Sequence, residues 1–215
     1  MTSEQRTKQA LQWWFYREFL KLFLESEKIR DDLLQECFTI RRNLDLLTID
    51  NLSLSVTEIP AYIKKIDKLH HSLVQLSDSL CPISIQDSLP LSIECLLEPW
   101  INSHPDLDFQ INMPVYWRIE EPKRSWIIVR SLEELLRITL PETEMLLPIY
   151  IHITLKQIGT IGLLTVKISY PDISTLIFYS HLPELEYLYD SFKFLISGKC
   201  SYFNKNLMSI WHFYW

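Results

Sequence analysis

A long stretch without proline or glycine dominates the N-terminal part of this chain and limits what it can fold into. Neither residue occurs between residues 4 and 47, so nothing there breaks a helix. The second half of the stretch carries apolar residues at steps of four, four, three, four and three: Ile29, Leu33, Cys37, Ile40, Leu44 and Leu47. This spacing predicts one long helix whose packed stripe follows a heptad pattern with one irregularity.

The first turns of this predicted helix are apolar on more than one side. The large apolar residues there are Leu11, Trp14, Phe15, Phe19, Leu22 and Phe23. A broad apolar surface suits burial against several neighbours rather than one. We therefore expect the N-terminal end of the helix to contact another element.

A second helix is predicted from Pro60, because proline suits the first turn of a helix. Its apolar residues recur at steps of four and three until Cys81 and Pro82 end it: Tyr62, Ile66, Leu69, Leu73, Leu76 and Leu80. The link before it holds the turn-forming residues Asp50 and Asn51. Two stripes of similar length joined by a short link predict an antiparallel helical hairpin, which we place in a first domain of residues 1–82.

A single hairpin of this kind leaves half of its apolar surface in water. Two hairpins that pair about a twofold axis would bury that surface as a four-helix bundle, so we expect a homodimer. The predicted dimer interface consists of stripe residues from both helices: Leu33, Ile40, Leu44, Ile66, Leu73 and Leu80.

The pattern changes in residues 83–215, which we predict to form a second, α/β domain. Helices are expected at residues 88–103, broken or ended near Pro99, at 125–139 and at 184–197, before Gly198. A strand is expected at residues 108–113 and a β-hairpin at 149–155 and 162–170. The aromatic tail that ends in Trp215 reads either as an edge strand or as an anchor for a partner. The predicted fold class is α+β, a helical hairpin followed by an α/β sandwich.

Composition narrows the choice of partners and cofactors. The net charge is −6, which predicts no general attraction to nucleic acid or anionic lipid. The sequence has no leader pattern and no apolar stretch long enough to cross a bilayer, so we expect a cytoplasmic protein with no membrane contact. Its four cysteines lack metal-ligand spacing, and we expect reduced thiols, no metal site and no cofactor.

Two segments resemble the bacterial two-component sensor histidine kinases. Residues 25–47 resemble the first helix of their dimerisation domain, sharing the fragment Asp-Asp-Leu-Leu-Gln at residues 31–35. Residues 76–97 resemble the passage from the second helix into the ATPase domain. The resemblance implies a dimerisation hairpin joined to an ATPase-like domain, with a response regulator or a sensor kinase as partner.

The sequence departs from the family where the family's chemistry lies. In the alignment the phosphorylated histidine falls on Arg30, which cannot accept a phosphoryl group. The helix at residues 125–139 lacks the asparagine that holds the metal ion in the family, and no Asp-x-Gly-x-Gly motif occurs. Since glycine-rich loops allow a close approach to phosphates, we predict a pseudokinase that is not an enzyme.

Some polar residues can be interpreted either as functional residues or as ordinary surface residues. Glu133 and Glu134 could be metal ligands or a general base, but their spacing between leucines favours a solvated helix face. His71, or less favourably His70, lies opposite the apolar stripe, where an exposed imidazole could accept a phosphoryl group. The sequence thus predicts a non-catalytic signalling adaptor in a two-component pathway, and the alternative is a phosphorelay phosphotransferase that uses His71.

Overall fold

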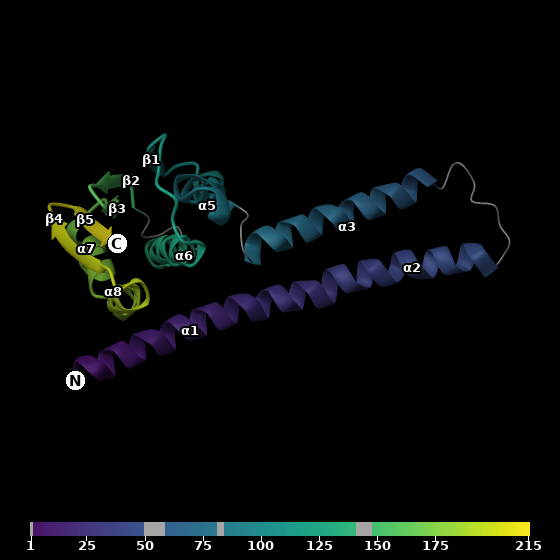
Figure 1. Ribbon diagram of the computed structural model, residues 1–215, viewed down its shortest axis with the longest axis horizontal. Coiled ribbons are helices and arrows are strands. Elements are labelled where there is room, and N and C mark those ends of the chain that lie inside the picture. Colours follow the sequence, from purple (N-terminus) through teal and green to yellow (C-terminus); the bar gives the residue numbers. More distant parts are fainter. Residues whose placement is uncertain (1, 50–58, 81–83, 141–147) are drawn as a thin grey trace. The chain divides into compact units, whose positions relative to one another are not determined.

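The computed structural model describes residues 2–49, 59–80, 84–140 and 148–215 (Figure 1). By its internal contacts the chain divides into two units. One unit consists of Tyr16–Ile83, and the other combines Met1–Phe15 with Ser84–Trp215. We call them the hairpin unit and the sheet unit. The predicted domain boundary at residues 82 and 83 stays a prediction.

The predicted helical hairpin is present. Its first arm runs through α1 (Ser3–Lys28), a π-helical turn η1 (Ile29–Leu33) and α2 (Leu34–Ile49), and its second arm is α3 (Ile59–Leu80). The two consecutive steps of four in the apolar stripe fall on η1 and the turn after it, because a π turn holds one more residue than an α turn. The link around Asp50 and Asn51 lies outside the described residues.

The sheet unit is built on five strands in the order β1-β2-β3-β5-β4. The strands are β1 (Asp108–Asn112), β2 (Tyr150–Ile158), β3 (Ile161–Ser169), β4 (Lys199–Lys205) and β5 (Met208–Tyr214). β1 pairs with β2 in parallel, and all other pairs are antiparallel. The predicted β-hairpin of β2 and β3 is confirmed. The aromatic tail forms β5, which lies inside the sheet, so an edge position for it is wrong.

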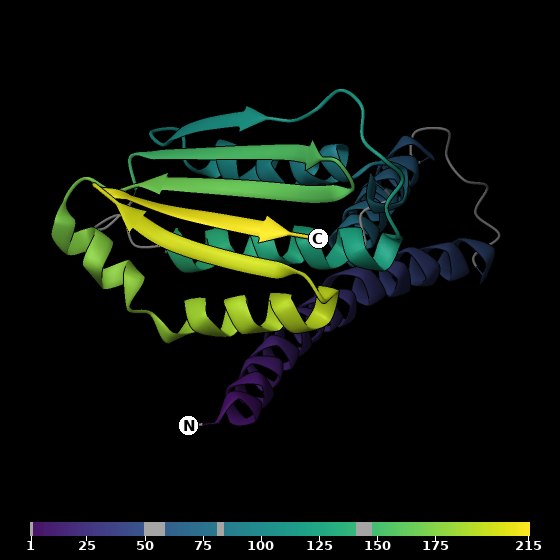
Figure 2. The same cartoon turned by 60° about the vertical axis from the view of Figure 1, so that its left-hand side comes forward.

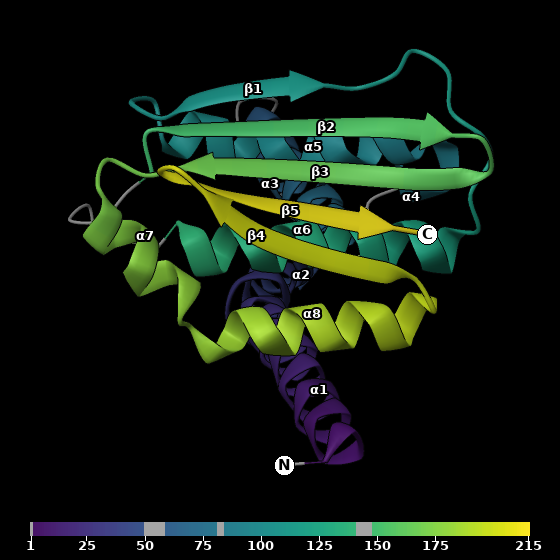
Figure 3. The same cartoon turned by 90° about the vertical axis from the view of Figure 1, so that its left-hand side faces the viewer.

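Helices cover one face of this sheet. Figures 2 and 3 show α5 (Leu89–Ser103), α6 (Pro122–Thr139) and α8 (Pro183–Ile196) on the same side of the strands. The short helices α4 (Ser84–Asp87) and α7 (Ile173–Ser180) complete the unit. Buried side chains alternate with partly exposed ones along most of β2 and β3, so every second residue of these strands enters the core between sheet and helices. The fully buried residues include Leu132, Ile151, Phe192, Trp211 and Phe213.

The N-terminal end of α1 belongs to the sheet unit, as its broad apolar surface predicts. Trp14 is part of the core, and the ring centroid of Trp13 lies 6.1 Å from that of Tyr187 on α8. The buried hydroxyl of Ser191 donates a hydrogen bond of 2.9 Å to the carbonyl oxygen of Ala10. The prediction that this end contacts another element is confirmed.

Two details of the sheet unit differ from expectation. Pro99 lies inside α5 and does not end the helix, which continues to Ser103. The side chain of Pro99 is exposed, so the ring meets solvent rather than packed neighbours. In addition, α7 and β4 lie in segments for which the sequence pattern predicted no element. The predicted fold class, a helical hairpin followed by an α/β sandwich, is confirmed.

None of the described helices combines the length and the apolar character that crossing a membrane requires.

Candidate functional site

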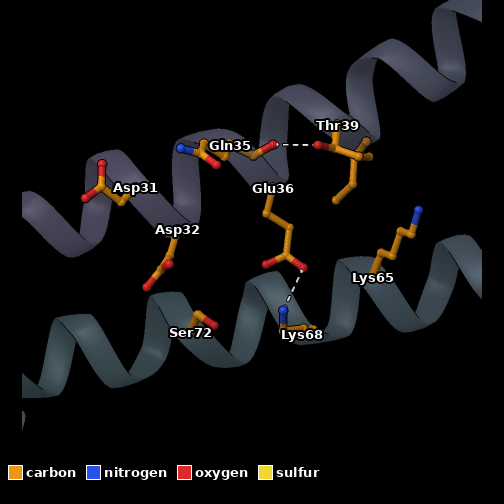
Figure 4. A pocket seen from close by; sticks show the side chains of 9 residues that line it. Asp31, Asp32, Gln35, Glu36, Thr39, Lys65, Lys68 and Ser72 are labelled. Atoms are coloured by element: carbon orange, nitrogen blue, oxygen red, sulfur yellow. Dashed lines mark hydrogen bonds and ion pairs between the residues drawn. The ribbon is translucent and has the colours of Figure 1, made fainter.

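A groove of about 470 Å³ lies between the two arms of the hairpin unit. The first arm lines it with Asp31, Asp32, Gln35, Glu36, Thr39 and Ile40, and the second arm with Lys65, Lys68 and Ser72. Figure 4 shows Asp32 and Glu36 pointing toward α3 from the first arm. One wall of the groove is therefore acidic and the other is basic.

The charges of the two walls are only partly matched. The ammonium of Lys68 lies 3.3 Å from a carboxylate oxygen of Glu36, but the Lys68 side chain is 74% exposed. An ion pair so open to solvent contributes between 0 and about 1 kcal/mol of stability. Lys68 and Glu36 can therefore give up their mutual ion pair and bind charged groups of a partner protein at little cost in free energy. The groove is suited to recognition of a polar surface.

The π turn places the two aspartates of this groove. Asp31 and Asp32 lie inside η1, and Leu33 at its end is buried, as is Ile40 seven residues later. These two apolar residues anchor the first arm while the polar residues between them stay accessible. Single π turns inside α-helices are frequent at functional sites.

Sequence reasoning missed the basic wall of the groove. Lys65, Lys68 and Ser72 follow one another at steps of three and four, which places them on one face of α3. This periodic signal was present in the sequence, but only the structure identifies the acidic wall as its neighbour.

The two candidate phosphoacceptor histidines of α3 are both exposed, as the position of His71 opposite the stripe predicts. Nε2 of His71 lies 3.1 Å from the side-chain amide nitrogen of Gln75. His71 directly precedes Ser72, which lines the groove. Its role as a phosphoacceptor stays a prediction.

The six predicted interface residues fall into two groups. Leu33 and Ile40 are buried to 7% and 8% exposure, so they pack within the chain itself. The other four keep between 42% and 50% of their surface in solvent: Leu44, Ile66, Leu73 and Leu80. Their assignment to a dimer interface stays a prediction.

The prediction of a solvated helix face at Glu133 and Glu134 is wrong. Glu134 is only 3% exposed, because α5 and α8 contact α6 and the strands lie over one side of it (Figure 3). Arg137 donates to both carboxylates, over 2.9 Å to Glu133 and 3.0 Å to Glu134, and Arg130 also pairs with Glu133. The glutamates are members of a charge network on α6. Within the described ranges, no three His, Cys, Asp or Glu side chains are grouped so as to hold a metal ion.

Two histidines on the face of the sheet opposite α5, α6 and α8 have perturbed pKa values. Burial, and then the positive charges of Lys167 and Lys156, lower the pKa of His152 below its ordinary value of 6.5. Burial and the charge of Lys167 also lower the pKa of His212. Both imidazoles therefore resist protonation in the folded chain more than in the unfolded one.

We expect the free energy of unfolding to fall as the pH falls through the ordinary histidine pKa. Below about pH 6.5 the unfolded chain binds more protons at these two positions than the folded chain does, so acid favours unfolding. Urea titrations at about pH 7.5 and about pH 5.5 measure the loss. The variant His152→Gln/His212→Gln is expected to lose less stability over this range, and an equal loss would contradict the prediction.

No protein-family model and no curated protein matches the chain. Solved structures of histidine kinases are similar to it at low identity. Histidine kinase AdeS of Acinetobacter baumannii is 10% identical, with 85% of this chain and 95% of that chain covered and a TM-score of 0.42. The catalytic domain of histidine kinase ThkA is 20% identical over 59% of this chain and 89% of that chain, also with a TM-score of 0.42. ThkA in complex with the response regulator TrrA is 14% identical over 99% of this chain and 66% of that chain, with a TM-score of 0.42.

These comparisons contradict the prediction that the chain is not an enzyme. The structures they find are histidine kinases, which are enzymes. The prediction was inferred from motifs that the sequence lacks. A missing motif does not determine which other side chains a fold brings to the same place.

Proposed function

We propose that this chain is a histidine-kinase-like signalling protein of a two-component pathway that acts through protein–protein interaction. Its hairpin unit pairs with a second copy into a four-helix bundle, and the groove between its arms receives a response regulator or a sensor kinase. The observation that carries the proposal is the exposed apolar stripe of the hairpin: Leu44, Ile66, Leu73 and Leu80.

Association of two hairpins would remove this stripe from water. Each of the four side chains leaves nearly half of its surface exposed, and burying the remainder contributes about 1 kcal/mol per residue. Further large apolar side chains on the same unit are more exposed still, among them Leu34 at 57% and Phe38 at 66%. A monomer that exposes so much apolar surface is prone to association.

The variant Ile66→Asp/Leu73→Asp is expected to be monomeric at concentrations at which the wild type is dimeric. A carboxylate buried without a partner in the bundle costs several kcal/mol, more than the association of this stripe supplies. Light scattering coupled to size exclusion measures the mass of each variant.

The matched control for this experiment is Lys64→Asp/Gln75→Asp. Both residues are exposed and lie on the side of α3 opposite Ile66. The control variant is expected to remain a dimer, and circular dichroism checks that both variants keep their helices. A wild type that is monomeric at every concentration would overturn the dimer.

Partner binding in the groove has a separate test. Neutralising the acidic wall by Asp32→Asn/Glu36→Gln should reduce the amount of response regulator that the immobilised protein retains from a lysate of its own cells. The variant Ile66→Asp/Leu73→Asp leaves both groove residues in place, so the two experiments distinguish loss of the groove from loss of the dimer. Equal retention by wild type and groove variant would contradict a role for the groove.

The position of His71 favours a second candidate function, phosphoryl transfer. Its imidazole is exposed and lies next to the groove in the sequence, where a phosphorylated receiver could reach it. Incubation with a labelled phospho-receiver should give an acid-labile label on the wild type and on His70→Ala but none on His71→Ala. No label on the wild type would eliminate this function.

A further inference from the structure

The face of the sheet opposite α5, α6 and α8, which we call the open face, has a charge opposite in sign to that of the whole chain. The five strands contain four lysines and two histidines but a single carboxylate, that of Asp108 at the start of β1: Lys156, Lys167, Lys199, Lys205, His152 and His212. Side chains alternate between the two faces, and the set that contains the fully buried Ile151, Val166 and Trp211 faces the helices. The four lysines and two histidines belong to the other set and lie on the open face. The chain as a whole carries a net charge of −6.

The strand register places these cations around an apolar and hydroxylated centre. Lys167 on β3 is paired with His152 on one side and with Ile210 on the other. Ile210 in turn is paired with Phe203, which is 47% exposed. The next row of residues paired across the strands contains hydroxyl side chains and His212. Oγ1 of Thr165 lies 3.1 Å from Nδ1 of this histidine.

The lysines of this face are unmatched by carboxylates in the part of the chain that the structure describes. Within the described residues, none of the four forms an ion pair with a carboxylate. Lys167 also disfavours protonation of both histidines, which indicates an uncompensated positive potential. A surface with such a potential attracts anionic groups and orients them.

We propose that the open face of the sheet binds an acidic segment of a partner protein. Carboxylates of the segment pair with Lys156, Lys167 and Lys199, and an apolar side chain covers Ile210 and Phe203. The surface is the second interaction site of the chain and does not depend on the groove of the hairpin.

Two other polyanions fit the geometry less well. The aromatic rings of this face contact one another at tilted angles, with centroids 5.8 Å apart for Phe203 and His212 and 6.0 Å apart for His212 and Tyr214. This arrangement leaves no separate platforms on which successive bases could stack. Ile210 is only 8% exposed in the middle of its strand, so it cannot insert into a bilayer as an anchor does.

The probe for the test is a fluorescein-labelled oligoglutamate peptide with one central leucine, titrated with the full chain and followed by fluorescence anisotropy. We expect saturable binding that Lys156→Gln/Lys167→Gln weakens about tenfold. The control Lys64→Gln/Lys123→Gln removes the same charge from exposed positions outside this face and should change the affinity by less than about twofold. Bound peptide should also raise the pKa of His152 and His212, read from their imidazole proton resonances.

A second pair of substitutions guards against a folding defect. Lys199 and Lys205 are exposed on the edge strand β4. The variant Lys199→Gln/Lys205→Gln should also weaken binding of the peptide. The proposal is overturned if no saturable binding occurs, or if face and control variants lose affinity equally. Tighter binding of oligothymidylate or of phosphatidylserine vesicles than of the peptide would equally overturn it.

Discussion

Replacing Trp211 by alanine is expected to lower the free energy of unfolding of the sheet unit by about 4 kcal/mol. Trp211 is completely buried and is among the largest side chains in the core. Its ring stacks on Tyr202 with a centroid distance of 4.4 Å and lies 6.0 Å from Phe213. Alanine would remove these contacts and leave a cavity beneath β5, which the surrounding strands cannot fill.

Phenylalanine at the same position is expected to change the stability by less than about 1 kcal/mol. The indole nitrogen of Trp211 is buried and has no hydrogen-bond partner within the described residues. A buried donor without an acceptor costs about 1–3 kcal/mol, and Trp211→Phe removes this cost while it loses part of the ring volume. Urea titration of both variants measures the difference, and equal losses would show that the size of the ring is not what matters.

The elements that could be predicted are those with a strong period in the sequence. The stripes on both arms of the hairpin, the apolar run of α6 and the alternation in β2 and β3 each specify their element locally. The helix α7 was missed, although Asp172 caps it by accepting a hydrogen bond from the backbone nitrogen of Thr175 over 2.8 Å. A cap before an apolar run is a weak signal when the run is short.

The charged sites could not be predicted because they depend on neighbours far away in the sequence. Glu134 reads as a solvated residue from its own helix, and only the helices packed beside α6 bury it. His212 and Lys167 come from segments that share a sheet face only after β5 enters between β3 and β4. Periodicity predicts which face of a helix or strand is buried. A charged site can be predicted only if the element that packs against that face is also known.

Replacing Gly198 by alanine is expected to lower the free energy of unfolding by about 3 kcal/mol. A Cβ atom at this position would overlap the backbone carbonyl oxygen of Tyr214 and would also lie 3.4 Å from both Phe192 and Ile196. A backbone atom cannot rotate away as a flexible side chain can, so the start of β4 would have to separate from the end of β5.

Gly159 provides the matched control for this prediction. It has a positive φ of 62°, and no atom lies within 4 Å of the place that an added Cβ would occupy, so alanine there meets only backbone strain of about 1 kcal/mol. The midpoint temperature of thermal unfolding should therefore be much lower for Gly198→Ala than for Gly159→Ala, and slightly lower for Gly159→Ala than for the wild type. If the two variants were equally stable, the close approach of Gly198 to the Tyr214 carbonyl would not constrain residue 198, because Gly198 lacks the positive φ that strains an alanine at position 159.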